Sequence, residues 1–310
     1  MLQYYAKHTP NEEFQRFSTP RHDNVWVYGD AITESDLSDV TQRFELDRNI
    51  VFDVRDEDEL PRVEYSVGNM YVFLRVPERT KRGTVTTSPL LAIVTPKAFL
   101  TLASINTFSP DHLAHVTGGL RSSDTSSLLT SAFAAVISEY EDLIKQTAHY
   151  IKDTSRRLQT HEITNKDFIH FVTIEDNLNE YRLSLDSMLT VARRLCENKH
   201  DVLSISDIEA IDDVVLYIQQ LLVAIGSHSQ SVTSIRNAYS TIANNTLNQR
   251  MKTLTTLTVL ITLPNVLFGM YGMNVALPFA DQPWAYALIV VFTFMLILAV
   301  YRLAKRSGMF

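Results

Sequence analysis

The sequence is poor in several features on which folds and sites are often built. Cysteine occurs once, as Cys196, so an intrachain disulfide is excluded and a reducing compartment is favoured. The formal net charge is −7, and no basic patch is interleaved with aromatic residues, so we expect no nucleic-acid partner. Walker, Rossmann and nucleophile-elbow motifs are also missing. We therefore expect no enzyme, no organic cofactor and no ATP-driven step.

Charge is almost missing from one long segment near the C-terminus. From Thr253 to Tyr301 the only charged residue is Asp281, and two apolar runs fill most of the segment. Each run has the ~20 residues that a helix needs to cross a bilayer. Such runs leave no polar face, which favours membrane spans over two buried helices of a soluble protein. The predicted domain, residues 251–310, is a transmembrane hairpin with spans at about 251–271 and 284–303 and an outer loop at 272–283.

Basic residues predict the topology of this hairpin. Arg250 and Lys252 precede the first span, Arg302, Lys305 and Arg306 follow the second, and the loop has no Lys or Arg. By the positive-inside rule, both termini are cytoplasmic and the loop lies outside the cytoplasmic membrane. The N-terminal sequence has no apolar h-region of a signal peptide, so the part before the hairpin is expected in the cytosol.

This cytosolic part changes character near Thr125. Before it, β-branched and aromatic runs are bounded by Gly, Pro and Asn, which predicts strands. Thr33 and Asp36 resemble the capping box that begins a helix. We predict an α+β domain over residues 1–125 and long coiled-coil-like helices over 126–250. The predicted strands are NVWVYG, EYSVGNMYVFLRVP, TVTTSPLLAIVTP and AFLTLAS.

After Thr125, apolar residues at alternating steps of three and four predict helices with one apolar face, which we call seams. Two seams cover residues 129–143 and 171–195, and a third covers 208–225, after an N-cap-like SISD. No helix breaker follows the third seam until Pro264, so this helix is predicted to run straight into the first span. From 206 to 263 it would be roughly 87 Å long.

The opposite face of this long helix carries a polar stripe. From Ser227, steps of three and four meet uncharged polar residues almost throughout. A polar stripe facing lipid would be costly, so we expect it to face protein or water. Close packing of small Thr and Ser side chains is one alternative, but the continuity favours an aqueous axis enclosed by several copies. The pore-lining candidates on this stripe are Asn237, Thr241, Asn244, Asn248, Met251, Thr255, Thr258, Thr262, Asn265 and Gly269.

The tetrapeptide YGMN ends the first span, and in this position it resembles the signature of the CorA family of magnesium and cobalt transporters. NVWVY, LPRVEYSVGNMYVFLRV and NQRMKTLTTLTVLITLP resemble further family segments, so the resemblance covers nearly the whole chain, loosely before Thr125. It implies a homopentamer in membrane lipid whose long helix lines a pore for Mg²⁺, and also for Co²⁺ or Ni²⁺. The implied selectivity filter is Tyr271, Gly272, Met273 and Asn274.

Asn274 is the implied contact of this filter with the metal ion. Mg²⁺ gives up its octahedral water shell reluctantly. A ring of Asn274 amides and of carbonyls near Gly272 could hydrogen-bond that shell. The alternative for both residues is an ordinary helix cap.

The resemblance implies two further sites. Met251 and Leu254 align with the hydrophobic constriction of the family, where dewetting blocks ions. Asp212 and Asp213, with Glu78 from a neighbouring copy, are candidates for its regulatory metal site, through which cytosolic Mg²⁺ would gate the channel. The alternative for the two aspartates is a solvated helix face.

The sequence departs from the family pattern in places. Asp281 is the only acid in a loop that is usually more acidic, and Asn237 stands where some relatives have aspartate. Met273 favours the magnesium branch over the zinc branch, which has Gly-Ile-Asn. Three hypotheses remain: a Mg²⁺ channel, a proton-coupled transporter of Zn²⁺ or another transition metal, and a non-conducting membrane-anchored sensor.

Overall fold

The computed structural model describes two compact units, Met1–Ile235 and Arg236–Phe310, and the helix α6 (Ile205–Tyr271) contributes to both. The described residues are 2–9, 11–17, 23–80, 83–105, 119–159, 165–273 and 282–306.

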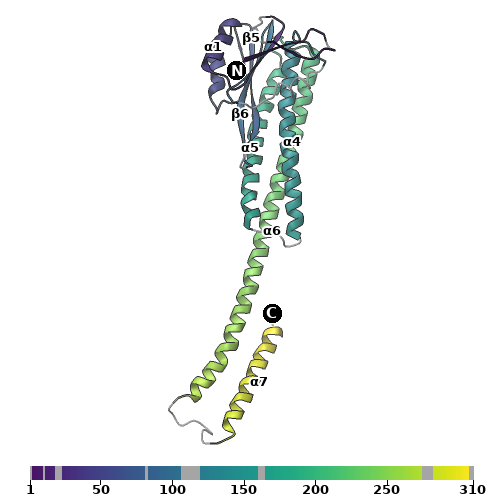
Figure 1. Cartoon of the computed structure of the whole chain (residues 1–310). Helices are drawn as coiled ribbons and strands as arrows, with labels where there is room; N and C mark the ends of the chain where they lie inside the picture. Colours follow the sequence, from purple (N-terminus) through teal and green to yellow (C-terminus); the bar gives the residue numbers. More distant parts are fainter. Residues whose placement is uncertain are drawn as a thin grey trace. The chain divides into compact units, whose positions relative to one another are not determined.

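The first unit is built on a mixed seven-stranded sheet (Figure 1). The strand order is β2-β1-β3-β7-β6-β5-β4, and every neighbouring pair is antiparallel except β3 and β7, which are parallel. Three of the four predicted strand segments are confirmed, whereas the fourth, EYSVGNMYVFLRVP, is not one strand but contains the end of β4, a turn and most of β5. The strands are β1 (Leu2–Ala6), β2 (Gln15–Phe17), β3 (Val25–Gly29), β4 (Arg62–Ser66), β5 (Asn69–Arg79), β6 (Val85–Val94) and β7 (Ala98–Ala103).

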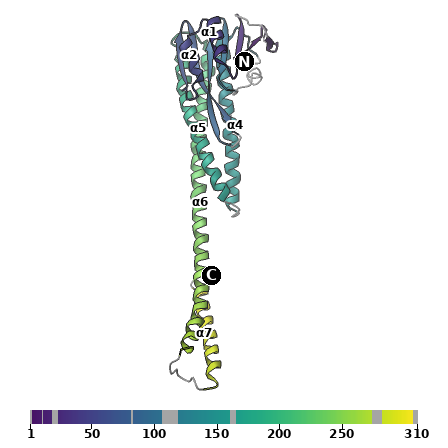
Figure 2. The ribbon, with the colours of Figure 1, turned by 60° about the vertical axis from the view of Figure 1, so that its left-hand side comes forward.

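Both faces of this sheet are buried, because successive side chains on a strand point to opposite sides. On β5, Tyr71 and Phe73 join the core formed with α1 (Glu34–Arg43), α2 (Arg48–Phe52) and η1 (Asp53–Arg55). Val72 and Leu74 join the core formed with the long helices. Figure 2 shows α1 and α2 on one side of the sheet, with α4 and α5 on the other.

The long helices confirm the predicted seams. α4 (Thr125–Gln159) and α5 (Asn165–Cys196) pack on the sheet through apolar residues spaced by three and four. Tyr140 of α4 and Tyr181 of α5 meet edge to face at 6.1 Å between ring centroids. The Tyr140 hydroxyl donates to the Arg75 carbonyl of β5 at 3.0 Å, so this contact joins both helices to the sheet.

A buried carboxylate ties the beginning of α4 to the beginning of α6. Asp207 is only 4 % exposed and accepts hydrogen bonds from the hydroxyls of Ser126, Ser127 and Ser204. Burial by itself would raise its pKa, but these bonds outweigh burial and hold the pKa of Asp207 below its usual range. The predicted N-cap in SISD is thus also a link between two helices.

A second carboxyl group in this unit has a raised pKa, in contrast to the lowered pKa of Asp207. Burial, followed by the charge of Asp142, raises the pKa of Glu139 on α4 to about 7. A carboxyl whose pKa is raised by folding opposes folding once it ionises, so stability falls as pH rises through about 7. Because Glu139 is partly exposed, we expect Glu139→Gln to stabilise the protein at pH 8 by only about 1–2 kcal/mol.

The measurement is thermal unfolding followed by circular dichroism at pH 8 and pH 5, where Glu139 is already protonated and the substitution should have little effect. The exposed Glu57, which belongs to neither hydrophobic core, provides the control Glu57→Gln. An equal shift at both pH values for Glu139→Gln would show that ionisation of this group does not matter.

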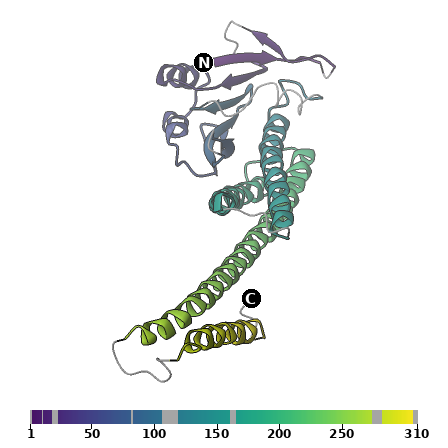
Figure 3. The ribbon, with the colours of Figure 1, turned by 60° about the horizontal axis from the view of Figure 1, so that its bottom comes forward.

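The second unit contains the rest of α6 and α7 (Ala285–Arg306), which lie side by side in all three ribbon views (Figure 3). Both helices are long and apolar enough to cross a membrane. Within the described part of this unit, only Thr256 and Thr293 are buried. Large apolar side chains are exposed all along both helices, as expected where lipid replaces a protein core.

α6 continues through Pro264 without ending. Proline has no N–H, so the carbonyl four residues earlier, that of Leu260, loses its helical donor. Such a gap is tolerated inside membrane helices where water, a side chain or a neighbouring helix can supply the missing hydrogen bond.

Candidate functional site

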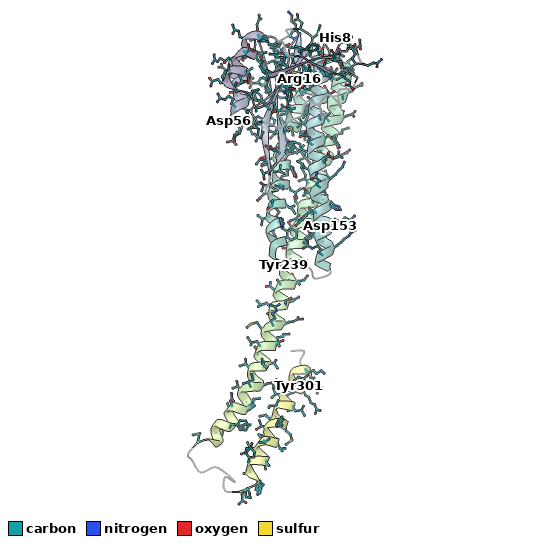
Figure 4. All side chains as sticks on the ribbon, viewed as in Figure 1. His8, Arg16, Asp56, Asp153, Tyr239 and Tyr301 are labelled. Carbon is teal, nitrogen blue, oxygen red and sulfur yellow. The ribbon has the colours of Figure 1, made fainter. Side chains whose placement is uncertain are left out.

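The candidate site is the polar stripe of α6. All of the predicted pore-lining residues, from Asn237 to Gly269, are exposed on this helix, and so are Met251 (54 %) and Leu254 (59 %) of the predicted constriction. Figure 4 shows side chains of α6 beyond Tyr239 extending from both visible sides of the helix. The stripe is therefore available to solvent or to further copies of the chain.

Three of the four threonines of the stripe share one hydrogen-bond geometry. The hydroxyls of Thr241, Thr258 and Thr262 donate to the carbonyl of the residue four positions earlier, at 2.9, 2.9 and 2.8 Å. A hydroxyl has one hydrogen to donate and two lone pairs with which it can accept. Because the hydrogen is used within the helix, each of these side chains presents an acceptor outward.

The last turn of α6 contains hydrogen bonds to carbonyls three residues earlier as well as four, and the helix does not end at a residue in the left-handed conformation. The Gly272 N–H bonds to the carbonyl oxygens of Phe268 (3.0 Å) and Gly269 (3.3 Å), and the Met273 N–H bonds to that of Met270 (3.3 Å). Gly272 is not among the residues with positive φ. Asn274 and the Tyr271 side chain lie outside the described residues, so the filter of Tyr271, Gly272, Met273 and Asn274 stays a prediction.

The predicted regulatory residues all belong to the first unit and are exposed: Asp212 and Asp213 on α6, and Glu78 on β5. Asp212 faces the end of α5, where its charge, after burial, helps to raise the pKa of Cys196. No group of three or more acidic, His or Cys side chains that could hold a metal occurs among the described residues of the single chain. A complete site would need a contribution from a neighbouring copy.

The sequence analysis missed Thr256 and Thr293. They lie on α6 and α7, and their hydroxyls donate to the carbonyls of Lys252 (2.9 Å) and Ile289 (2.7 Å). Both side chains are buried, and small hydroxyl residues of this kind allow membrane helices to approach closely. The sequence did contain a signal for them: Thr256 lies on α6 outside the polar stripe, and Thr293 is the single threonine in an apolar run of α7.

Residues 22–306 match the family described as "CorA-like Mg2+ transporter protein". The chain belongs to the CorA family. The match spans both units, so it confirms the resemblance seen in the sequence.

A curated CorA relative, the "Cobalt/magnesium transport protein CorA" of Methanocaldococcus jannaschii, is 29 % identical over 103 residues. This alignment covers 33 % of the chain and 32 % of the relative, about a third of each.

Solved structures share the fold, and two full-length ones share it along nearly the whole chain. The complete CorA magnesium transporter of M. jannaschii superposes with a TM-score of 0.83 at 18 % identity, covering 100 % of this chain and 99 % of that one. The full-length CmaX protein gives 0.74 at 15 % identity, covering 98 % and 97 %. The ZntB cytoplasmic domain of Vibrio parahaemolyticus gives 0.63 at 10 % identity, covering 78 % and 98 %. A membrane protein with an α+β domain, long helices and a C-terminal hairpin is thus confirmed.

Proposed function

We propose that the protein is a divalent-cation channel that passes Mg²⁺ into the cytosol through the centre of a homopentamer. The observation that carries this proposal is the exposed stripe of α6, in which polar side chains continue through an otherwise apolar span. A single hairpin cannot enclose a pore, so the stripe needs other copies around a shared axis. The membrane potential drives entry, at about 2.3 kcal/mol per charge per 100 mV.

The threonine geometry suits a hydrated cation. Mg²⁺ holds its waters tightly, and those waters present O–H donors to their surroundings. The outward lone pairs of Thr258 and Thr262 are acceptors for such donors. A lining that accepts hydrogen bonds without carboxylates binds the hydrated ion weakly enough to release it.

The remaining parts of the proposal follow the family pattern. Asn274, three residues after the last residue of α6 in the sequence, selects the hydrated ion, while Met251 and Leu254 form the constriction. Asp213 and Asp212, with Glu78 of a neighbour, hold regulatory Mg²⁺. Cytosolic Mg²⁺ bound there would join neighbouring copies and favour the closed state.

A second candidate is a proton-coupled transporter of Zn²⁺ or another transition metal. The fold similarity to a ZntB cytoplasmic domain favours it over the non-conducting sensor, although it concerns the fold of that domain alone.

Ion flux in vesicles tests the proposal. With purified full-length protein, we expect inward flux of Mg²⁺, with Co²⁺ and Ni²⁺ carried less and Zn²⁺ least, and no change when a pH gradient is imposed. The channel provides the path and the potential the force, so protons have no part in the step. Fluorescent indicators inside the vesicles measure each ion.

Flux that requires the pH gradient and favours Zn²⁺ would support the transporter instead, and no flux of any ion would leave the sensor. Light scattering of the same detergent-solubilised sample should give the mass of five chains, whereas a uniform dimer would contradict the pore.

A further inference from the structure

A cavity of about 330 Å³ opens at one end of the sheet in the first unit, on the face that α1 covers. Its lining comes from the end of α1, the residue before Asn24, the β4–β5 turn and the β6–β7 turn. None of the residues proposed for conduction or for its regulation lies there.

The floor of the cavity contains a polar side chain without a partner. Asn69, the first residue of β5, is only 6 % exposed, and its carboxamide makes no hydrogen bond among the described residues. Thr95 also lines the cavity, but it does not serve as a partner for Asn69. Its hydroxyl already donates to the Ala98 carbonyl (2.9 Å) and accepts from the Ala98 N–H (2.8 Å). The donor and the acceptor of this carboxamide are therefore available to a ligand that enters the cavity.

The charges around the cavity leave one carboxylate free. Arg43 Nη2 lies 2.8 Å from Asp39, and Lys97 Nζ lies 3.4 Å from Asp23, so both cations of the lining already have an anion. Glu45 has no ion pair or hydrogen bond among the described residues. It follows Phe44, the C-cap residue of α1, and the last carbonyls of this helix add partial negative charge. The cavity therefore favours a positive ligand.

Two residues at the rim have an unfavourable backbone conformation. Glu45 has φ +53° and Val67 has φ +52°, the left-handed region in which glycine or asparagine is usual. Val67 has this conformation because it forms the two-residue turn between β4 and β5 together with Gly68 (φ +75°), and this turn leaves its side chain 69 % exposed beside the cavity. Both residues line the same cavity, where Val67 and Phe44 form an apolar wall.

We propose that this cavity binds an organic monocation, a guanidinium or primary ammonium on a short apolar stem. The charged head donates to the Glu45 carboxylate and to the Asn69 carboxamide oxygen, and the stem lies against Phe44 and Val67. A divalent metal fits poorly, because Mg²⁺ needs about six oxygen ligands and the lining offers one unpaired carboxylate. An anion would meet Glu45 and the negative end of α1.

The test uses the full-length protein in deuterated detergent and saturation-transfer difference NMR. The probe is n-butylguanidinium, and n-butylurea is its neutral counterpart of the same shape. We expect n-butylguanidinium to bind at least tenfold more tightly than n-butylurea. Glu45→Gln and Asn69→Ala should each weaken binding at least tenfold, whereas Glu57→Gln, at an exposed carboxylate outside the cavity lining, should leave it unchanged.

Glu45→Gly separates loss of the ligand from loss of the fold. Glycine suits the left-handed conformation, so this variant should unfold at a higher temperature and still lose binding. Failure of n-butylguanidinium to bind, equal binding of n-butylurea, or binding that survives both Glu45→Gln and Asn69→Ala would overturn the proposal. None of these outcomes touches the proposal of ion conduction, which rests on the second unit.

Discussion

Asn274→Ala is expected to lower Mg²⁺ flux at least 100-fold while leaving the oligomer intact. The substitution removes both the donor and the acceptor that would contact the hydration shell, and it does so in every copy around the pore. At about 0.5–1.5 kcal/mol per hydrogen bond, the losses around the ring sum to several kcal/mol. The measurement is Mg²⁺ flux into vesicles, with the mass checked by light scattering.

An inert complex tests whether the ring contacts water rather than the ion itself. Cobalt hexaammine has the size of hydrated Mg²⁺ and does not shed its ligands, so it should block the native protein from outside. Asn274→Asp keeps an acceptor and adds charge, and we expect it to change ion selectivity rather than to abolish flux. Parental Mg²⁺ flux in Asn274→Ala, without block by the complex, would reduce this segment to a helix cap.

Thr258→Val should lower Mg²⁺ flux about tenfold. Valine keeps the shape of threonine but removes the oxygen whose hydrogen is donated to the Leu254 carbonyl at 2.9 Å and whose lone pairs face outward. Each copy then loses one acceptor for the hydrated ion, and a loss of about 1.4 kcal/mol in the barrier is tenfold in rate. The same vesicle assay measures the effect.

Thr253→Val is the matched control. Thr253 is also exposed on α6, and its hydroxyl donates to the Gln249 carbonyl at 3.0 Å, but it lies on the opposite side of the helix from the stripe. The control therefore removes the same bond without touching the proposed lining. Equal flux in the two variants would mean that the stripe does not line the ion path.

Sequence reasoning succeeded where a local pattern reports burial. The three-and-four spacing of Leu129, Phe133 and Tyr140 predicted a buried helix face, and all three are 0 % exposed. β1, β2 and α2 were missed because three to five residues are too few to show a period. The parallel pairing of β3 with β7 could not be predicted from local sequence either, since it joins segments far apart in the chain.

The candidate site was predictable only in part, for a physical reason. The stripe on α6 follows from helical spacing, and its exposure is seen in the structure. What the stripe faces depends on other copies, which a single sequence does not encode locally. The cavity beside Asn69 could not be foreseen either, because four separate segments form it and the left-handed conformations of Glu45 and Val67 break the usual residue preferences.

The parallel contact of β3 with β7 also determines the order in which the sheet can assemble. Strands β4 to β7 pair as consecutive neighbours, so short loops bring them together soon after they are synthesised. β3 pairs with β1, but its other edge has to wait for residues 98–102. Distant pairings are slow to form, and until then an edge rich in Val25, Trp26 and Val27 stays open. This interval during synthesis is when the protein is most exposed to aggregation.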